Sequence, residues 1–214
     1  ILHKLTSHQC SQYIEPFFGG GSIGLKMLEN CYTTDIWIND KDIGISCLWT
    51  AIIRYPLSLI DKITNFTPKV EDFYRLKKEL INIKECPEDK FGIVDIGFNK
   101  LVIHQISYSG LVTKSGGPLG GEKQESKYKI DCRWSPKYIC KQIQKYHELF
   151  KLVLISDIRC TNLDFADLIN DAKNTLIYLD PPYYVKGNEL YQHSFSINDH
   201  ERLSKKLIDV KCNW

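Results

Sequence analysis

Short apolar runs that end in polar residues recur along the chain and predict strands of a buried sheet. The clearest run covers residues 176–179 and ends at Asp180, Pro181 and Pro182. Proline has no N–H to continue a sheet, so the strand must end here, with Asp180 at its carboxyl end, where open α/β sheets bind ligands. The carbonyl of Pro181 can accept a hydrogen bond from such a ligand. From spacing alone, an ordinary turn with a capping aspartate explains the stretch equally well.

Further apolar runs predict the rest of the sheet and its helices. We expect strands at residues 12–17, 34–39, 153–157 and 175–180. Helical spacing and capping residues predict helices at residues 42–54, 71–82, 98–106, 136–150 (after Ser135) and from Ser196 to about Val210. The pattern predicts loops at residues 86–97 and 107–129, and a turn at 163–165 that leads into another helix. This alternation predicts an α/β fold, with a mostly parallel sheet and helices on both faces.

A glycine-rich turn follows the first predicted strand. Gly19, Gly20 and Gly21 permit a tight turn and a close approach of the backbone to a ligand, and Ser22 is suited to cap the next helix. Asp40 follows the second predicted strand, 19 residues after Gly21, which is the separation expected for an acid that binds ribose hydroxyls in dinucleotide-type folds. Asp40 could also cap the helix predicted at residues 42–54.

Length and composition limit the classes to which the chain can belong. The 214 residues, 43% of them hydrophobic, suffice for one core with a small inserted region. No apolar run is long enough to span a membrane and no signal peptide is recognisable, so we expect a cytoplasmic protein. The eight cysteines include no Cys-x-x-Cys pair and complete no zinc pattern with the six histidines. We therefore expect no metal, and reduced thiols that are mostly buried.

Positive charge is concentrated in one region of the chain. Residues 114–145 include eight basic and three acidic residues, a net charge of +5, whereas the whole chain carries +2. This region overlaps residues 107–129, which are glycine-rich and too polar for a core element. A local basic excess suggests contact with a polyanion, with candidate contacts at Tyr108, Lys114, Lys123, Lys127, Lys129 and Arg133. A solvated lysine-rich face is the alternative.

Two of these motifs resemble motifs of a known enzyme family. Asp180, Pro181, Pro182 and Tyr183 match the Asp-Pro-Pro-Tyr catalytic motif of amino-group DNA methyltransferases, and residues 15–22 resemble their S-adenosylmethionine (AdoMet) motif. The order of the motifs, along nearly the whole chain, is similar to that of the Dam-type adenine-N6 methyltransferases. The resemblance implies a Rossmann-like catalytic domain at residues 1–54 and 150–214, with a sheet that is incomplete at both chain ends. It also implies an inserted region at residues 55–149 that recognises double-stranded DNA.

The resemblance assigns roles to individual residues as well. The Asp180 carboxylate and the Pro181 carbonyl are expected to hold the target amine, while Tyr183 stacks on a flipped-out base and Tyr108 fills the gap it leaves. Asp40 is expected to bind the ribose of AdoMet, and Asp164 with Phe165 its adenine. The complete set expected at the cofactor is Glu15, Pro16, Phe17, Phe18, Gly19, Gly20, Gly21, Ser22, Asp40, Asp164, Phe165 and Asp180.

Three alternatives stay open on the sequence alone. The motifs are compatible with N4-cytosine methylation, or with methylation of RNA or of a protein glutamine amide. The chain begins at Ile1 without the family's upstream Gly-Gly-Lys segment, as a truncated portion of a longer enzyme would, and such a portion could be a catalytically silent nucleic-acid-binding module. A plain nucleotide-binding domain does not require the glycine turn, Asp40 and Asp180 in this order. We expect a DNA adenine methyltransferase, for which a cognate restriction endonuclease encoded nearby is a conceivable partner.

Overall fold

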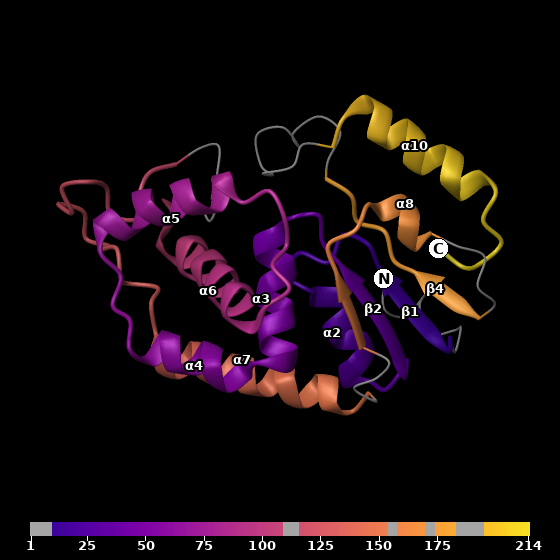
Figure 1. The fold of residues 1–214 in the computed structure, drawn as a ribbon, viewed down its shortest axis with the longest axis horizontal. Helices are drawn as coiled ribbons and strands as arrows, with labels where there is room; N and C mark the ends of the chain where they lie inside the picture. The colour runs from indigo at the N-terminus through magenta and orange to yellow at the C-terminus, as the bar shows by residue number, and fades with distance from the viewer. Residues whose placement is uncertain (1–9, 109–115, 154–157, 170–173, 183–194) are drawn as a thin grey trace. The chain divides into compact units, whose positions relative to one another are not determined.

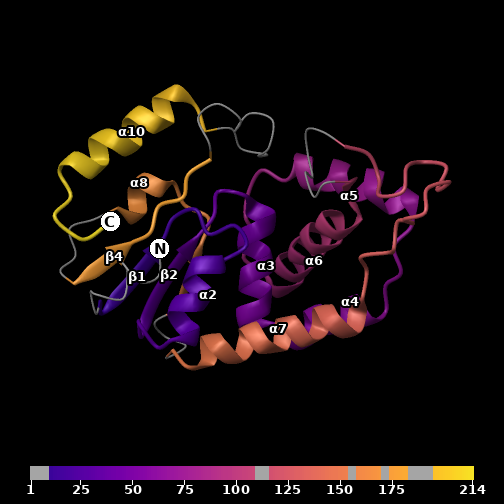
Figure 2. The same ribbon diagram turned by 180° about the vertical axis from the view of Figure 1, so that it is seen from behind.

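The computed structural model describes residues 10–108, 116–153, 158–169, 174–182 and 195–214. The chain divides into two compact units. Unit 1 consists of Ile1–Lys41, Tyr146–Tyr184 and Phe195–Trp214, and unit 2 of Asp42–Lys145 and Val185–Ser194. Figures 1 and 2 show the helices and strands of both units. The first change of unit falls between Lys41 and Asp42, and the domain boundary expected at 54/55 stays a prediction.

Unit 1 is built on a sheet of parallel strands. The described strands are β1 (Gln12–Glu15), β2 (Asp35–Asn39), β3 (Ile158–Thr161) and β4 (Thr175–Ile177), and their order across the sheet is β3-β2-β1-β4. All three pairings are parallel. The predicted α/β fold with a parallel sheet is confirmed. The strands expected at residues 12–17, 34–39 and 175–180 are present in shorter form, whereas the one expected at 153–157 falls almost entirely outside the described residues.

Side chains of alternate strand residues face opposite layers of unit 1, as the two-residue period of a strand requires. Ile14 and Ile177 pack with Phe165 of α8 (Phe165–Leu168) and Leu203 of α10 (Ile197–Ile208). Tyr13 and Glu15 face Gly24 of α2 (Ser22–Glu29). Figures 1 and 2 accordingly show α2 on one side of the sheet and α8 with α10 on the other. Because both faces are covered, β1 is buried almost throughout.

Three helices of unit 1 begin at identifiable cap residues, and caps had been predicted for two of them, at Ser22 and Ser196. Ser196 caps α10 as expected: its hydroxyl accepts a hydrogen bond from the Asp199 N–H over 3.1 Å, and the Asp199 carboxylate accepts from the Ser196 N–H over 3.0 Å. Asp164 caps α8 by accepting from the Ala166 N–H over 3.0 Å. The prediction that Ser22 caps α2 was wrong. Gly21 is the cap residue, and Ser22 is already the first residue of the helix.

Unit 2 is helical over most of its described length. Its helices are α3 (Ile43–Arg54), α4 (Pro56–Thr64), α5 (Val70–Asn82), α6 (Lys90–Ile106) and the first part of α7 (Pro136–Lys151). The predictions of α3, α5 and α7 are confirmed, and α4 was not predicted. The loop expected at residues 86–97 was wrong beyond Asp89, which caps α6 by accepting from the Gly92 N–H over 2.9 Å. Helix α6 contains both Gly92 and Gly97, which lie in the segment expected to be a loop.

The carboxylate of Asp42 contacts both α3 and α6 in unit 2. Asp42 accepts a hydrogen bond from the Ile45 N–H over 3.1 Å and thus caps α3. The same side chain pairs with Lys100 of α6 over 2.5 Å, and both side chains are largely buried. The cap of α3 is therefore Asp42 rather than Asp40. The pair fixes the start of α3 against α6, the helix with which it makes most of its contacts.

The cysteines are all free thiols, and the described helices differ in how apolar they are. No disulfide joins any of the eight cysteines, all of which lie among the described residues. Only Cys10 and Cys47 are buried, whereas Cys31, Cys86 and Cys132 are exposed, so the expectation of mostly buried thiols was wrong. Within the described part of the chain, no single helix is long and apolar enough to cross a membrane. Helices α3 and α4 reach the necessary length and apolar character only when they are counted together, and the chain bends by 109° between them.

Candidate functional site

The glycine turn after β1 is held by backbone hydrogen bonds and leaves open space beside it. The Phe18 N–H donates to the Asn39 carbonyl over 2.9 Å, and the Gly21 N–H donates to the Phe18 carbonyl over 2.7 Å. Gly19 has φ of 49° and Gly21 has φ of 70°, a left-handed backbone in which other residues are strained. A Cβ atom built on Gly20 would meet no heavy atom within 4 Å. A ligand can therefore reach the backbone of this turn.

Asp40 lies directly against the glycine turn. The Gly19 N–H donates to Asp40 Oδ2 over 2.8 Å. The backbone of Asp40 is fixed from the other side, because Asn162 Nδ2 donates to the Asp40 carbonyl over 2.7 Å. Two predicted cofactor elements that are 21 residues apart in sequence are thus in contact. Asn162, which the sequence analysis did not single out, supports them.

Asn39, the last residue of β2, connects the chain that follows β1 to the end of β3 and the chain that follows it. Its Nδ2 donates to the carbonyls of Pro16 over 3.1 Å and Leu163 over 3.2 Å. Its Oδ1 accepts from the Leu163 N–H and from the Thr161 hydroxyl, each over 2.8 Å. The amide is 1% exposed, and these four bonds use its full capacity of two donors and two acceptor positions. Asn39 therefore fixes the loop after β1 relative to the loop that carries Asp164.

Three phenylalanines form one cluster in unit 1. The ring centroids of Phe17 and Phe165, both predicted at the cofactor, are 5.8 Å apart. Phe195 packs against Phe17 at 5.5 Å and against Phe165 at 5.3 Å. Phe195 was not predicted as a site residue. It precedes the cap residue of α10, and its ring centroid lies 4.6 Å from that of His200, the fourth residue of the helix. A hydrophobic residue in that position before a capping box is a recognisable signal.

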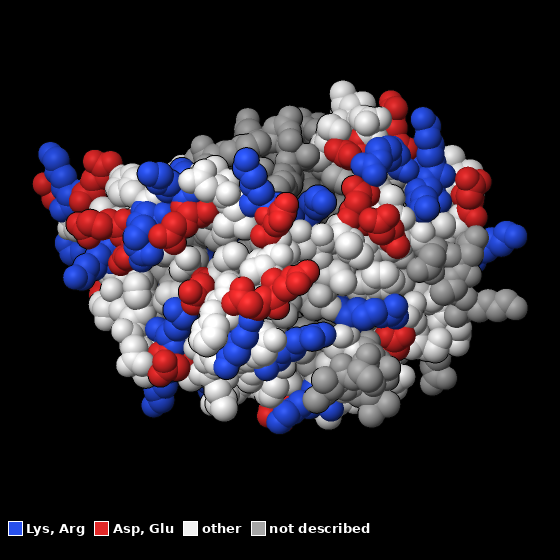
Figure 3. All heavy atoms as spheres, in the orientation of Figure 1, with Lys and Arg blue, Asp and Glu red and all other residues white. Residues whose placement is uncertain are grey.

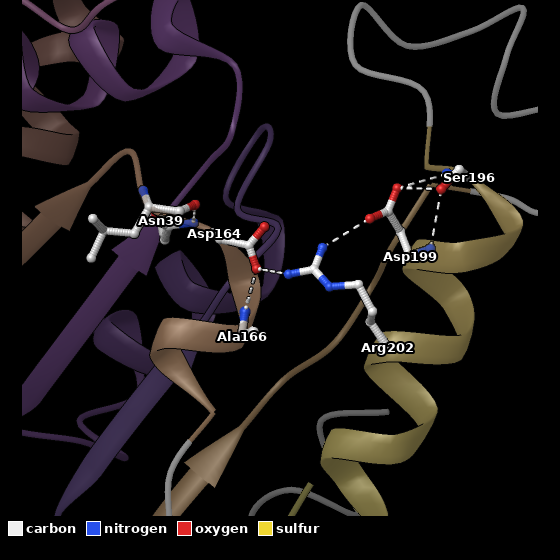
Figure 4. Close-up of polar contacts among 7 residues, drawn as sticks. Asn39, Asp164, Ala166, Ser196, Asp199 and Arg202 are labelled. Atoms are coloured by element: carbon white, nitrogen blue, oxygen red, sulfur yellow. Dashed lines mark hydrogen bonds and ion pairs between the residues drawn. The ribbon is translucent and has the colours of Figure 1, made fainter.

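Arg202 of α10 holds the loop that carries Asp164 (Figure 4). Its Nη2 donates to Asp164 Oδ1 over 2.9 Å, and its Nη1 donates to Asp199 Oδ1 over 3.0 Å. The guanidinium also lies 5.0 Å from the centroid of the Phe165 ring, within the range of a cation–π contact. Arg202 was not predicted as a site residue, because nothing local in the sequence links it to a residue 38 positions earlier.

Glu15 is a buried acid at the end of β1. It is 3% exposed, and its Oε2 accepts from the Tyr13 hydroxyl over 2.7 Å and from the Gly24 N–H over 3.0 Å. Burial raises the pKa of Glu15 to about 8, although both hydrogen bonds lower it; the negative charges of Asp180 and Asp40 add to the rise. At neutral pH the carboxyl group is therefore mostly protonated. It contributes shape and hydrogen bonds to the site more than charge.

Asp180 is exposed, whereas Pro181 and Pro182 are half-buried. Strand β4 ends at Ile177, so Asp180 lies three residues beyond the strand and not at its last residue, as was expected. The chain nevertheless continues along β1, because the Tyr178 N–H donates to the Ile14 carbonyl over 2.9 Å. Tyr183 lies outside the described residues. The described part of the motif thus follows β4 at the edge of the sheet where β1 ends in Glu15 and where Asp40 follows β2.

Comparison with known proteins identifies the family of the chain. The family model for D12 class N6 adenine-specific DNA methyltransferases matches residues 1–213. The chain belongs to this family. It is therefore an enzyme of the class that methylates the N6 amine of adenine in DNA. No curated protein matches the chain.

The residues predicted to bind DNA lie in unit 2 of this D12 class methyltransferase. Ser107 and Pro118 form an isolated antiparallel bridge, and the Tyr108 N–H donates to the Gly117 carbonyl over 3.1 Å. The side chain of Tyr108 is 65% exposed, and Lys123, Lys127, Lys129 and Arg133 are exposed as well. Lys114 lies outside the described residues.

Two of these cations also contact their own unit. The Lys129 ammonium donates to the Gln124 carbonyl, and Arg133 Nη1 donates to the Ser107 carbonyl over 3.4 Å. On the face drawn in Figure 3, basic and acidic side chains of the described residues are interspersed. In the described part of the methyltransferase, no three His, Cys, Asp or Glu side chains are grouped so that they could hold a metal ion.

Proposed function

We propose that this D12 class enzyme transfers a methyl group from AdoMet to the N6 amine of adenine in double-stranded DNA, with Asp180 as the catalytic carboxylate. The observation that carries the proposal is that three acids lie at the carboxyl ends of three neighbouring parallel strands: Glu15 is the last residue of β1, Asp40 follows β2, and Asp180 follows β4. Open α/β sheets bind their ligands at this edge. The negative charges of Asp180 and Asp40 both raise the pKa of Glu15, which supports the view that the three acids lie near one another.

The residues at this edge fit AdoMet. The open space at Gly20 and the left-handed backbone at Gly19 and Gly21 suit a ligand that approaches the main chain closely. Asp40 would receive the ribose hydroxyls, and Asp164 with Phe165 would bind the adenine. Pro16, Phe17, Phe18 and Ser22, the other predicted cofactor residues on either side of the turn, would complete the AdoMet site. When bound, AdoMet supplies a methyl group on a positively charged sulfur.

The catalytic motif acts on the target amine. An exocyclic adenine amine is a poor nucleophile because its lone pair is delocalised into the ring. The Asp180 carboxylate and the Pro181 carbonyl each accept one amine hydrogen, which localises the lone pair and aims it. Pro182 keeps the Pro181 carbonyl in an extended backbone. Tyr183 would stack on the base, which must leave the duplex to reach this edge.

Unit 2 would supply the contacts to DNA. Tyr108 would fill the gap left by the flipped base, and the exposed lysines Lys123, Lys127 and Lys129 are suited to phosphates, a role also expected of Lys114. Arg133, with its planar fork, is the candidate for a base edge. A cytoplasmic enzyme paired with a restriction endonuclease of the same specificity is the setting that this activity suggests.

Replacement of Asp180 in the 214-residue chain tests the proposal. Asp180→Ala should abolish methyl transfer from labelled AdoMet to DNA, while AdoMet affinity measured by calorimetry stays measurable. Asp180→Asn keeps the shape and loses the charge, so it should be nearly as inactive. Asp167→Ala removes another exposed carboxylate of unit 1, on α8, and should retain activity. Transfer above background in Asp180→Ala, or a methylated product other than N6-methyladenine in the unaltered protein, would refute the assignment.

A further inference from the structure

Two cysteines of unit 2 lie with their sulfur atoms in contact. Cys47 Sγ on α3 is 3.7 Å from Cys86 Sγ, although the residues are 39 positions apart. Cys47 is 1% exposed, whereas Cys86 is exposed in the segment 83–89 between α5 and α6. The pair therefore combines a thiol that solvent reaches with a second thiol directly behind it.

The environment of Cys86 favours the reactive form of its sulfur. The hydrogen bond from the Cys47 thiol stabilises the Cys86 thiolate and lowers the pKa of Cys86 to about 7, although partial burial raises it. The thiolate is the form that attacks electrophiles and oxidants. Redox-sensor cysteines are typically solvent-accessible and low in pKa, and they often lie next to a second thiol that resolves the oxidised sulfur.

We propose that Cys86 and Cys47 form an oxidation site, at which a hydroperoxide converts the two thiols into a disulfide. This site is separate from methyl transfer and does not depend on the proposed function.

The reaction has two steps. In the first, the Cys86 thiolate attacks one oxygen of hydrogen peroxide: an S–O bond forms, the O–O bond breaks, and hydroxide leaves, so that Cys86 becomes a sulfenic acid. In the second, the Cys47 sulfur attacks the Cys86 sulfur: the S–S bond forms, the S–O bond breaks, and the sulfenic oxygen leaves as water with the Cys47 proton. Two thiols are oxidised, one peroxide is reduced, and two waters result once the hydroxide takes up the proton that Cys86 had released.

The geometry allows the bond with a small displacement. A disulfide bond is about 2.05 Å long, so the two sulfur atoms must approach by less than 2 Å. Cys86 lies in a short connection between two helices, where a shift of the backbone disturbs no helix hydrogen bonds. The closed bond would tie this connection to α3 across 39 residues. A cross-link of this span restricts the unfolded chain, so the oxidised protein should unfold at a higher temperature than the reduced protein.

Peptide mapping after oxidation tests the site. The reduced full-length chain is treated with stoichiometric hydrogen peroxide, its remaining thiols are alkylated, and the protein is digested without reductant and analysed by mass spectrometry. We expect a linked pair of peptides that contain Cys47 and Cys86, and its loss on addition of dithiothreitol. Cys86→Ser, at an exposed position, should yield no linked peptide and no rise in melting temperature. Cys132→Ser removes another exposed thiol of unit 2 and should leave both unchanged.

The pH dependence of alkylation provides a measurement that needs no variant. The alkylation rate of Cys86 in the unaltered protein should be half-maximal near pH 7. At pH 7 it should exceed the rate of an exposed thiol of ordinary pKa roughly threefold, because the larger thiolate fraction outweighs the lower nucleophilicity of each thiolate. Linkage of Cys86 to other cysteines as often as to Cys47 would overturn the proposal. So would accumulation of Cys86 sulfenic or sulfinic acid without linkage.

Discussion

Arg202 and Asp164 form an ion pair that connects α10 to the loop before α8 across 2.9 Å. The same guanidinium covers one face of Phe165. Asp164 and Phe165 are the two residues proposed to bind the adenine of AdoMet, so Arg202 contacts both without belonging to the motif itself. The ion pair positions the Asp164 carboxylate, which also caps α8. We infer that Arg202 is a positioning residue for the cofactor site.

Arg202→Ala should weaken AdoMet binding two- to fivefold in a calorimetric titration, because Asp164 loses one of the two donors that orient it. Thermal stability should hardly change, since the paired side chains are 42% and 35% exposed and such pairs contribute little to folding. Arg202→Lys keeps the charge but not the two-pronged geometry, and should restore affinity only in part. Lys205→Ala removes a charge from the same helix and should bind normally. Tighter binding by Arg202→Ala would mean that the guanidinium competes with the cofactor.

Two glycines of the same region should respond to alanine in different ways. A Cβ on Gly24 would lie 2.7 Å from the Phe18 ring and 2.8 Å from the Glu15 carboxylate. Overpacking of this kind costs about 1–3 kcal/mol, which outweighs the gain of up to about 1 kcal/mol from alanine in a helix. Gly24→Ala should therefore lower the melting temperature. Gly20→Ala meets no atom within 4 Å and should leave stability unchanged.

The two variants should also differ in ligand binding. If AdoMet occupies the open space beside Gly20, the methyl group of Gly20→Ala should weaken its binding about tenfold, or roughly 1.4 kcal/mol. Normal affinity of Gly20→Ala in calorimetry would place the cofactor elsewhere. A stable Gly24→Ala would show that Phe18 and Glu15 can yield to the added group.

The sequence predicted the parts of the site that are local in the chain. The glycine turn and Asp40 were predicted because each follows a strand signal at a recognisable spacing, whereas Asp164 was predicted from the family resemblance. Asn39 was read only as the end of a strand, because its bonds to Leu163 and Thr161 span more than 120 residues. Helix α6 was partly missed for a related reason. Gly92 and Gly97 disfavour a helix locally. Helix α6 is stabilised instead by the burial of its apolar side chains, which a local sequence pattern does not display.

Glu15 should make the stability of the protein depend on pH. Its pKa is about 8 in the folded protein, against about 4.3 in an unfolded chain, so the folded state binds the proton more strongly. The corresponding stabilisation is complete below about pH 4.3 and is lost as the pH rises to about 8, at up to about 1.4 kcal/mol per pH unit. Glu15→Gln cannot ionise, yet its amide oxygen can still accept from Tyr13 and Gly24. The variant should gain stability relative to the unaltered protein between pH 5 and pH 8, measured as a difference in melting temperature. A constant difference over this range would show that Glu15 is ionised in the folded protein.

The basic segment of unit 2 provides a test of where DNA binds. Lys123, Lys127 and Lys129 are exposed, and each phosphate contact releases counterions, so the logarithm of DNA affinity falls with the logarithm of salt by about 0.9 per contact. Replacement of all three by alanine should flatten that slope by about 1.8 to 2.7. The lower figure applies if Lys129 remains bonded to Gln124 instead of contacting a phosphate. The loss of affinity should be the same for every DNA sequence, because phosphates carry no sequence information.

Matched lysines separate this effect from a general change in charge. Lys205, Lys206 and Lys211 are exposed residues of unit 1, and their joint replacement by alanine removes the same charge. That variant should keep the unaltered salt slope in binding titrations at several salt concentrations. An unchanged slope in the Lys123, Lys127 and Lys129 variant would identify those side chains as a solvated surface. A change in the Lys205, Lys206 and Lys211 variant alone would move the DNA contact to α10 and the segment that follows it.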